Sequence, residues 1–218
     1  MKKILFALIA TTTIFTSCKK DGGGGSTTSD SYLPNTTATN WTFKKTSGTT
    51  ISNVTYTVTT NTITNNGITF TQASGSDGSS QYYAQVGTDY HNLLQASGQN
   101  IDLVILKSDK NLNDTWTSSS TIPVTGVPGV TTATVNITYK MLLKGGARTV
   151  LTNNFTDVIR VQATLTATAG LPIPLSLGTI DYYFAKGVGI IENVANLNNT
   201  QLGLNNNDKY EIQSWEVK

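Results

Sequence analysis

The stretch Val54-Thr55-Tyr56-Thr57-Val58-Thr59 decides the fold, because apolar and threonine side chains alternate along it. Successive side chains of a β-strand point to opposite faces, so this spacing predicts a strand with one buried face and one polar face. Asn66-Gly67 follows, a pair typical of two-residue hairpin turns since both turn positions take positive φ. Ile68-Thr69-Phe70-Thr71 then resumes the alternation. These residues therefore predict an antiparallel hairpin.

The same period of two begins at Trp41 and continues to the end of the chain. Gly145-Gly146 is expected to turn the chain. Ile212 and the pair Trp215/Val217 have opposite parities, which predicts either a bulge in the last strand or burial on both of its faces. The best helix candidate is Ala195–Leu204, although it is rich in Asn and poor in helix formers. The sequence thus predicts a single antiparallel all-β domain. Further strands are expected at Gln81–Val86, Tyr90–Leu94, Ile101–Lys107, Thr115–Thr117, Val130–Lys144, Val158–Thr168, Leu175–Lys186, Ile190–Val194 and Tyr210–Val217.

The N-terminus has the pattern of a secretory signal. Lys2 and Lys3 form a basic start, and an apolar run follows that is too short to span a bilayer in the usual way. Phe15-Thr16-Ser17-Cys18 resembles the lipobox of bacterial lipoprotein signals, in which cleavage precedes the cysteine and lipid is attached to its thiol. Residues 1–17 are therefore predicted as a lipoprotein signal peptide and Cys18 as the lipidation site. An ordinary secretory signal is the alternative, and an uncleaved membrane anchor is the least favoured because the apolar run is short.

Residues 18–39 are predicted to be the lipidated cysteine and a flexible tether, and residues 40–218 to be the β domain. Gly22 to Gly25 and the Ser/Thr run after them have the composition of a flexible linker. We expect an outer-membrane anchor through the N-terminal lipid. Lys19-Lys20-Asp21 contains a single acid, which leaves the periplasmic and the cell-surface face both open.

The charge of the chain argues against nucleic-acid binding, and its cysteine content argues against disulfides. Cleavage would remove Lys2 and Lys3 from the 15 basic residues and leave 13 against 13 acidic ones, so the mature chain would be neutral. Nucleic-acid binding needs a basic footprint and is therefore not expected. Cys18 is the single cysteine of the chain, so packing without disulfides must hold the domain together.

A segment in the last third, Ile180-Asp181-Tyr182-Tyr183-Phe184-Ala185-Lys186-Gly187-Val188-Gly189-Ile190-Ile191-Glu192, resembles a loose group of uncharacterised Bacteroidota-type lipoproteins. Leu112-Asn113-Asp114-Thr115-Trp116 and Phe155-Thr156-Asp157-Val158-Ile159 also fit that group. The resemblance implies a curled antiparallel sheet, somewhat like the half-barrels of lipoprotein carriers, and it brings no catalytic residues. A β-sandwich is the alternative fold.

Residues able to carry catalysis or bind metal are few. His91 is the sole histidine, and its place in a predicted strand indicates a solvent-facing side chain rather than a catalytic base. One histidine without a free cysteine makes a zinc site improbable. Asp157, Asp181, Glu192 and Glu211 are expected to be solvated or salt-bridged surface acids, because no spacing selects a catalytic pair. We therefore predict no cofactor, no metal and no enzymatic activity, with a carboxylate-based hydrolase as the least favoured alternative.

Two tyrosine pairs, Tyr82-Tyr83 and Tyr182-Tyr183, are the candidate ligand-binding residues. Neighbours in a strand point to opposite faces, so one member of each pair should face outward or into a cleft. Such aromatic side chains line apolar clefts or stack on sugars. The sequence predicts a binding or scaffolding role, with an apolar ligand or lipid held in the curled sheet. A surface module that binds glycan or protein is the alternative.

Overall fold

The computed structural model describes residues 30–96, 99–123, 132–168, 174–199 and 204–218, and these form one antiparallel sheet. The predicted signal peptide, Cys18 and most of the predicted tether lie outside the described residues. The strands are β1 (Asn40–Ser47), β2 (Thr50–Asn65), β3 (Ile68–Gly75), β4 (Ser80–Val86), β5 (Asp89–Ala96), β6 (Gln99–Lys107), β7 (Thr115–Pro123), β8 (Thr132–Val150), β9 (Asn153–Thr168), β10 (Leu175–Ala185), β11 (Gly189–Asn199), β12 (Leu204–Asn206) and β13 (Asp208–Glu216).

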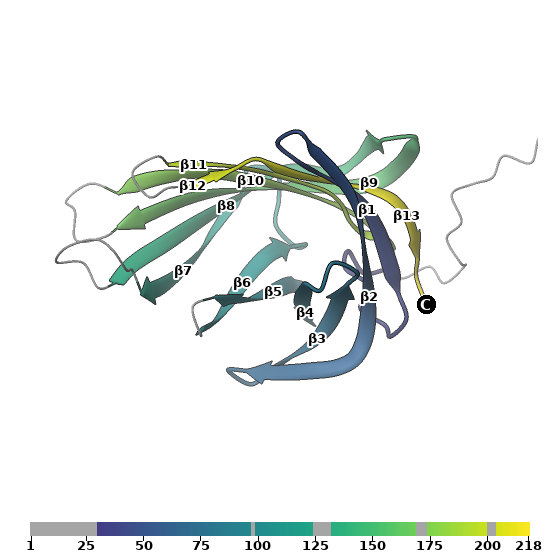
Figure 1. Ribbon diagram of the computed structural model, residues 1–218, viewed down its shortest axis with the longest axis horizontal. Helices are drawn as coiled ribbons and strands as arrows, with labels where there is room; N and C mark the ends of the chain where they lie inside the picture. The colour runs from purple at the N-terminus through teal and green to yellow at the C-terminus, as the bar shows by residue number, and fades with distance from the viewer. Residues whose placement is uncertain (1–29, 97–98, 124–131, 169–173, 200–203) are drawn as a thin grey trace, which may run out of the picture.

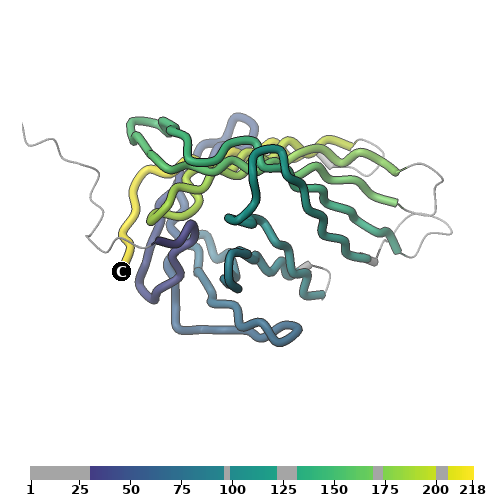
Figure 2. The backbone as a smooth tube through the Cα atoms, turned by 180° about the vertical axis from the view of Figure 1, so that it is seen from behind, coloured from purple at the N-terminus to yellow at the C-terminus, as the bar shows by residue number. Residues whose placement is uncertain are grey.

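The sheet curls until its two edges approach each other. Its strand order is β6-β5-β4-β3-β2-β1-β13-β11-β10-β9-β8-β7, with β12 paired to β11. β3 to β6 lie opposite β7 to β11, and β1, β2 and β13 join the two halves on one side (Figure 1). Trp116 of β7 donates its indole N–H to the carbonyl of Val104 in β6 at 2.7 Å, across the seam between the edges. The predicted curled sheet is confirmed, and the alternative β-sandwich is wrong because one continuous sheet forms both halves (Figure 2).

In β2, the apolar side chains of the alternating pattern are the ones that are buried. Val54, Tyr56 and Val58 are buried, while the threonines between them are more exposed. The predicted turn joins β2 to β3, with φ of 49° at Asn66 and 79° at Gly67. Of the two alternatives for the last strand, the bulge is present, because the register of β13 against β1 shifts between Thr42 and Phe43.

Two local predictions are wrong. Gly145-Gly146 does not turn the chain: β8 continues to Val150, and the register against β9 shifts at the glycines. The turn comes at Leu151, whose φ is 53°. The glycines therefore bend a long hairpin, as bulges do, instead of ending it. The helix considered for Ala195–Leu204 is absent from its described part, because β11 extends to Asn199 and pairs with β10.

The end of the β8–β9 hairpin packs on the outer face of the sheet. The ring of Phe155 lies 5.2 Å from that of Trp215, and the Asn153 side-chain amide donates to the carbonyl of Gln213 at 3.2 Å. Phe155 shares an apolar cluster with Tyr183 and Ile191. The hairpin therefore covers part of the outer face, where Arg148 of β8 also lies over the ring of Tyr183, and the concave face is left as the place for a site.

Candidate functional site

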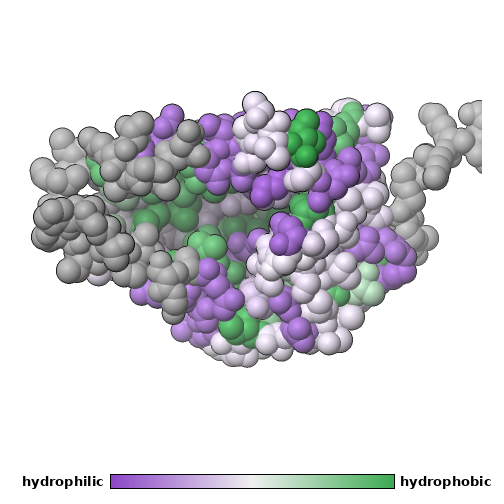
Figure 3. Space-filling model, viewed as in Figure 1, coloured by the Kyte–Doolittle hydropathy of each residue, from purple (hydrophilic) through white to green (hydrophobic). Residues whose placement is uncertain are grey.

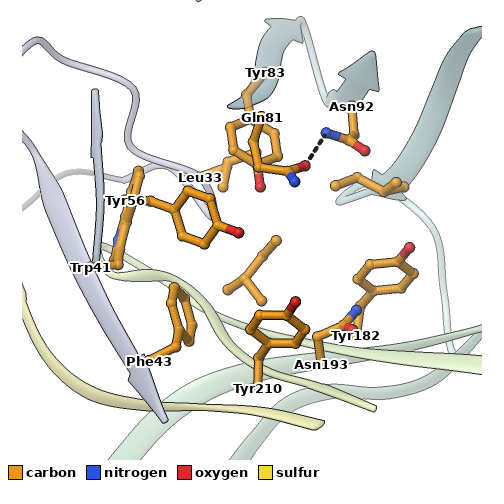
Figure 4. Close-up of a pocket in the computed structure, with 12 residues that line it drawn as sticks. Leu33, Trp41, Phe43, Tyr56, Gln81, Tyr83, Asn92, Tyr182, Asn193 and Tyr210 are labelled. Atoms are coloured by element: carbon orange, nitrogen blue, oxygen red, sulfur yellow. Dashed lines mark hydrogen bonds between the residues drawn. The ribbon is translucent and has the colours of Figure 1, made fainter. Parts of the chain in front are cut away.

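A cavity of about 220 Å³ lies inside the curl of the sheet. Figure 3 shows the molecule hollowed between the two halves of the sheet, with apolar residues at the base of the hollow. The cavity is larger than the roughly 150 Å³ needed to enclose benzene and smaller than typical drug-sized pockets of about 300–1,000 Å³. Its lining consists of Leu33, Trp41, Phe43, Tyr56, Gln81, Tyr83, Asn92, Ile105, Tyr182, Ile190, Asn193 and Tyr210 (Figure 4).

One row of polar side chains crosses three neighbouring strands of the cavity wall. Tyr182 of β10 pairs with Asn193 of β11, and Asn193 pairs with Tyr210 of β13. Residues directly opposite each other in adjacent strands share a face and stand close together. We call these three residues the first polar row.

A second polar row lies on the other half of the sheet and consists of Gln81 and Tyr83 from β4 and Asn92 from β5. Tyr83 and Asn92 are opposite each other in the ladder, and the Asn92 amide donates weakly to Gln81 at 3.5 Å. Figure 4 shows the two rows facing the same space from opposite sides. Strand alternation therefore brings two hydroxyl-and-amide surfaces together across the cavity.

Apolar side chains form the wall of the cavity between the two rows. Trp41 and Phe43 come from β1, and the indole N–H of Trp41 donates to the carbonyl of Val188 at 2.6 Å. Gly189, with φ of 116°, allows this approach, since a Cβ there would lie 3.0 Å from the indole nitrogen. The turn between β10 and β11 thus fixes an aromatic wall of the cavity.

Residues 30–39, which we call the N-terminal strap, close part of the cavity ahead of β1. Leu33 is buried and belongs to the lining. The Tyr32 hydroxyl donates to Asp157 at 2.7 Å, and its ring packs edge-on against Tyr90 at 6.3 Å. The Gly187 amide donates to the carbonyl of Ser31 at 2.8 Å. The last residues of the predicted tether therefore contact the domain.

The hydroxyls of Tyr56, Tyr83 and Tyr182 remain protonated at neutral pH, because their pKa values are raised. Burial raises the pKa of Tyr182 to about 12. Burial also raises the pKa of Tyr83, with smaller contributions from neighbouring Tyr56, Tyr182 and Tyr210. Burial raises the pKa of Tyr56 as well. These groups are therefore uncharged hydrogen-bond donors and acceptors, and the lining carries no charged side chain.

One member of each predicted tyrosine pair faces the cavity. Tyr83 and Tyr182 belong to its lining, whereas Tyr82 packs against the cluster of Phe70, Ala84 and Leu93. Tyr183 points to the other face, where the guanidinium of Arg148 lies 3.6 Å from its ring centroid. Sequence reasoning missed the other lining residues, although the alternation that places Tyr182 inward also places Asn193 and Tyr210 there.

The four acids considered for catalysis lie outside the cavity and are engaged with other groups. Glu192 is 3% exposed and forms ion pairs with Arg148 and Lys209. Lys209 also pairs with Glu211 at 2.7 Å. Asp181 pairs with Arg160 at 2.9 Å, and Asp157 accepts a hydrogen bond from Tyr32. The expected ion pairs are present at Asp181, Glu192 and Glu211, but the expectation of surface acids is wrong for Asp181 and Glu192, which are buried.

The expectation of a solvent-facing His91 is wrong. This residue is 6% exposed, its Nδ1 lies 2.9 Å from a carboxylate oxygen of Asp102, and its ring packs edge-on against Phe70. Its neighbour Asn92 faces the cavity, so His91 points to the opposite face of β5. That face is covered as well, which alternation within one strand does not reveal.

No group of three metal-ligating side chains occurs among the described residues. Within the same residues, no helix is long and apolar enough to cross a membrane.

Comparison with models of known protein families gives no match, and comparison with curated protein sequences gives none either. Among solved structures, the chain is similar to a "putative lipoprotein" from Parabacteroides distasonis, with a TM-score of 0.50 and 10% identity over 84% of this chain and 97% of that one. It is also similar to a "putative exported protein with YmcC-like fold" from Bacteroides fragilis, with a TM-score of 0.48 and 9% identity over the same shares of the two chains. At this identity, the likeness to the Parabacteroides protein concerns the fold.

Proposed function

We propose that this chain is a lipid-anchored cell-envelope protein without a catalytic role, whose curled sheet holds an apolar ligand or lipid in its concavity. The cavity itself carries the proposal. It lies on the concave face of a sheet whose opposite face is partly covered by the β8–β9 hairpin, and aromatic and aliphatic side chains form most of its wall. Ligand sites are typically concave, mostly apolar and equipped with a few polar groups.

The envelope location rests on the lipobox-like Phe15-Thr16-Ser17-Cys18 and on the glycine-rich segment after it. A structural neighbour called a "putative lipoprotein" gives further support. We place the anchor in the outer membrane and leave both of its faces open. Three acyl chains on Cys18 would make the attachment effectively permanent, because each buried methylene contributes about 0.8 kcal/mol.

Cell fractionation tests the anchor. The wild-type chain should be recovered with outer-membrane vesicles and should incorporate labelled fatty acid, whereas Cys18→Ala should lose the label and the membrane association. Protease treatment of intact cells then distinguishes the surface from the periplasm. Wild-type protein recovered in soluble form, with an unmodified N-terminus, would contradict the proposal.

Binding of N-phenylnaphthylamine, an uncharged apolar fluorophore, tests the cavity. Each contact described above lies within residues 30–218, so the chain from Lys19 onward retains them all. We expect saturable fluorescence enhancement that Ile190→Phe, which fills the cavity, weakens at least tenfold. Leu94→Phe, at a site 46% exposed, is the matched control and should bind as the wild type does. Equal binding by both variants would place the fluorophore elsewhere.

A surface module for glycan or protein is the second candidate. It requires outward aromatic side chains that share one exposed face. Tyr82 and Tyr183 instead pack in two separate clusters, so nothing in the geometry favours this candidate over the cavity.

A further inference from the structure

The polar side chains of the cavity contain groups without a protein partner. Within the described part of the chain, no hydrogen bond reaches the hydroxyls of Tyr83 and Tyr182 or the side-chain amide of Asn193. Among the described residues, the only fully buried side-chain nitrogen or oxygen that lacks a partner is Nδ2 of Asn65. The three groups therefore keep accessible surface, and in Figure 4 they face the cavity from both polar rows.

These groups make no hydrogen bond that would hold the described part of the fold together. Hydrogen bonds of the sheet are made by its backbone, and an interior position of a strand is normally filled by an apolar side chain. Leucine or valine at positions 182 and 193 would pack the same wall without unpaired polar atoms. The unpaired groups are thus suited to a partner that enters the cavity.

The charge distribution restricts that partner. No lining residue is charged, and burying an isolated carboxylate or ammonium away from water is strongly unfavourable. Lys45 lies beside the first polar row, opposite Tyr210 in the ladder, with its ammonium 5.3 Å from the Tyr210 ring centroid, and it is not part of the lining. The carboxylates of Asp77 and Asp208 interact electrostatically with the Lys45 ammonium and so weaken its attraction for an anion. The site therefore does not favour a charged head group.

Resting on the function proposed above, we infer that the ligand is a neutral single-chain lipid whose ester or amide linkage lies between the two polar rows. Its alkyl part extends along Trp41, Phe43 and Leu33, and its carbonyl accepts hydrogen bonds from the hydroxyl of Tyr182 and the amide of Asn193. Tyr83 meets the same linkage from the opposite side. The volume of about 220 Å³ fits one short acyl segment with its linkage, so a longer chain would continue beyond the cavity.

Competition at fixed chain length tests this inference. Methyl octanoate, octanoate and octylammonium differ only in the polar end, and each is titrated at pH 8 against the chain from Lys19 preloaded with N-phenylnaphthylamine. We expect methyl octanoate to displace the fluorophore at a concentration at least tenfold below those of the two ions. Tyr182→Phe and Asn193→Leu should each weaken methyl octanoate about fivefold, the equivalent of one neutral hydrogen bond.

Tyr183→Phe is the matched control, because it removes a tyrosine hydroxyl next to Tyr182 in β10 but on the opposite face of the sheet. It should leave all three affinities unchanged. Octanoate binding most tightly, with the preference abolished in Lys45→Gln, would overturn the inference in favour of an anionic ligand. Equal affinities for the three compounds would overturn it too, while bound fluorophore would still support the proposed function. A chain that fails to bind the fluorophore would overturn both.

Discussion

Leu33 provides the sharpest test of the N-terminal strap, because it is the one large aliphatic residue among residues 30–39. Its side chain is 4% exposed and packs in a cluster that includes Tyr90, Trp116 and Tyr139. Leu→Ala substitutions in protein cores cost about 2–5 kcal/mol, depending on the cavity that remains. Leu33 already borders a cavity and therefore has fewer neighbours to lose, so we expect Leu33→Ala to cost about 2 kcal/mol. That value corresponds to a change of roughly 30-fold in the unfolding equilibrium.

Equilibrium unfolding in urea, followed by tryptophan fluorescence, measures this cost. With a denaturant slope of about 2 kcal/mol/M, the midpoint should fall by about 1 M. Leu112→Ala makes the same chemical change at a side chain 55% exposed, and should alter stability by less than about 0.5 kcal/mol. If the two variants had the same midpoint, the strap would not pack against the sheet in solution, and Leu33 would have to be removed from the cavity wall.

Three further substitutions test other parts of the structure. Gly178→Ala should prevent folding as judged by circular dichroism, because a Cβ there would lie 2.0 Å from a backbone carbonyl oxygen. Gly48→Ala has open space around it, so this variant should fold and lower the free energy of unfolding, measured in urea, by about 1 kcal/mol. Burial raises the pKa of Tyr182 from 10.0 to about 12, so its hydroxyl ionises more readily in the unfolded chain. The free energy of unfolding is therefore unaffected by this ionisation below pH 10 and falls as the pH rises toward 12. The wild type should therefore lose about 1.4 kcal/mol more than Tyr182→Phe between pH 8 and pH 11, and identical losses would contradict the burial of that hydroxyl. Glu192→Gln removes a buried charge from between Arg148 and Lys209 and should lower the free energy of unfolding by about 2 kcal/mol, which lowers the thermal midpoint. Glu216→Gln, at the exposed ion pair with Lys218, should leave the thermal midpoint unchanged.

Most strands could be predicted because alternation is a local property. Thr/apolar spacing identified β2, and Asn66-Gly67 identified its turn, since both signals depend on a few adjacent residues. Alternation does not say what a buried face packs against, so the single curled sheet and the sandwich could not be distinguished by it. The turn predicted at Gly145-Gly146 was wrong for a related reason. Two glycines suit a turn and a bulge equally, and the partner strand β9 decides between them.

The site was harder to predict than the fold. Both tyrosine pairs contain one residue of the cavity wall, yet the pairs alone do not tell which one, because the hairpin of β8 and β9 covers the outer face and buries Tyr183 as well. The strap was assigned to the tether on composition. Its only local signal is Tyr32-Leu33, the sole pair of large apolar side chains between Gly22 and Trp41.

The number of strands explains why a cavity exists, but it does not explain why polar side chains line that cavity. About eight strands give a barrel whose interior side chains can fill, and wider sheets enclose space. Twelve strands follow one another around this curl, and large aromatics together with Leu33 fill only part of its interior. Folding alone would favour an apolar lining for the remaining space, because each unpaired polar group there reduces stability. The hydroxyl of Tyr182 and the amide of Asn193 oppose that tendency on adjacent strands, in register with each other. A replacement of both by apolar residues should therefore increase the free energy of unfolding while it weakens binding of methyl octanoate, and a variant that lost stability and binding together would show that these groups serve the fold.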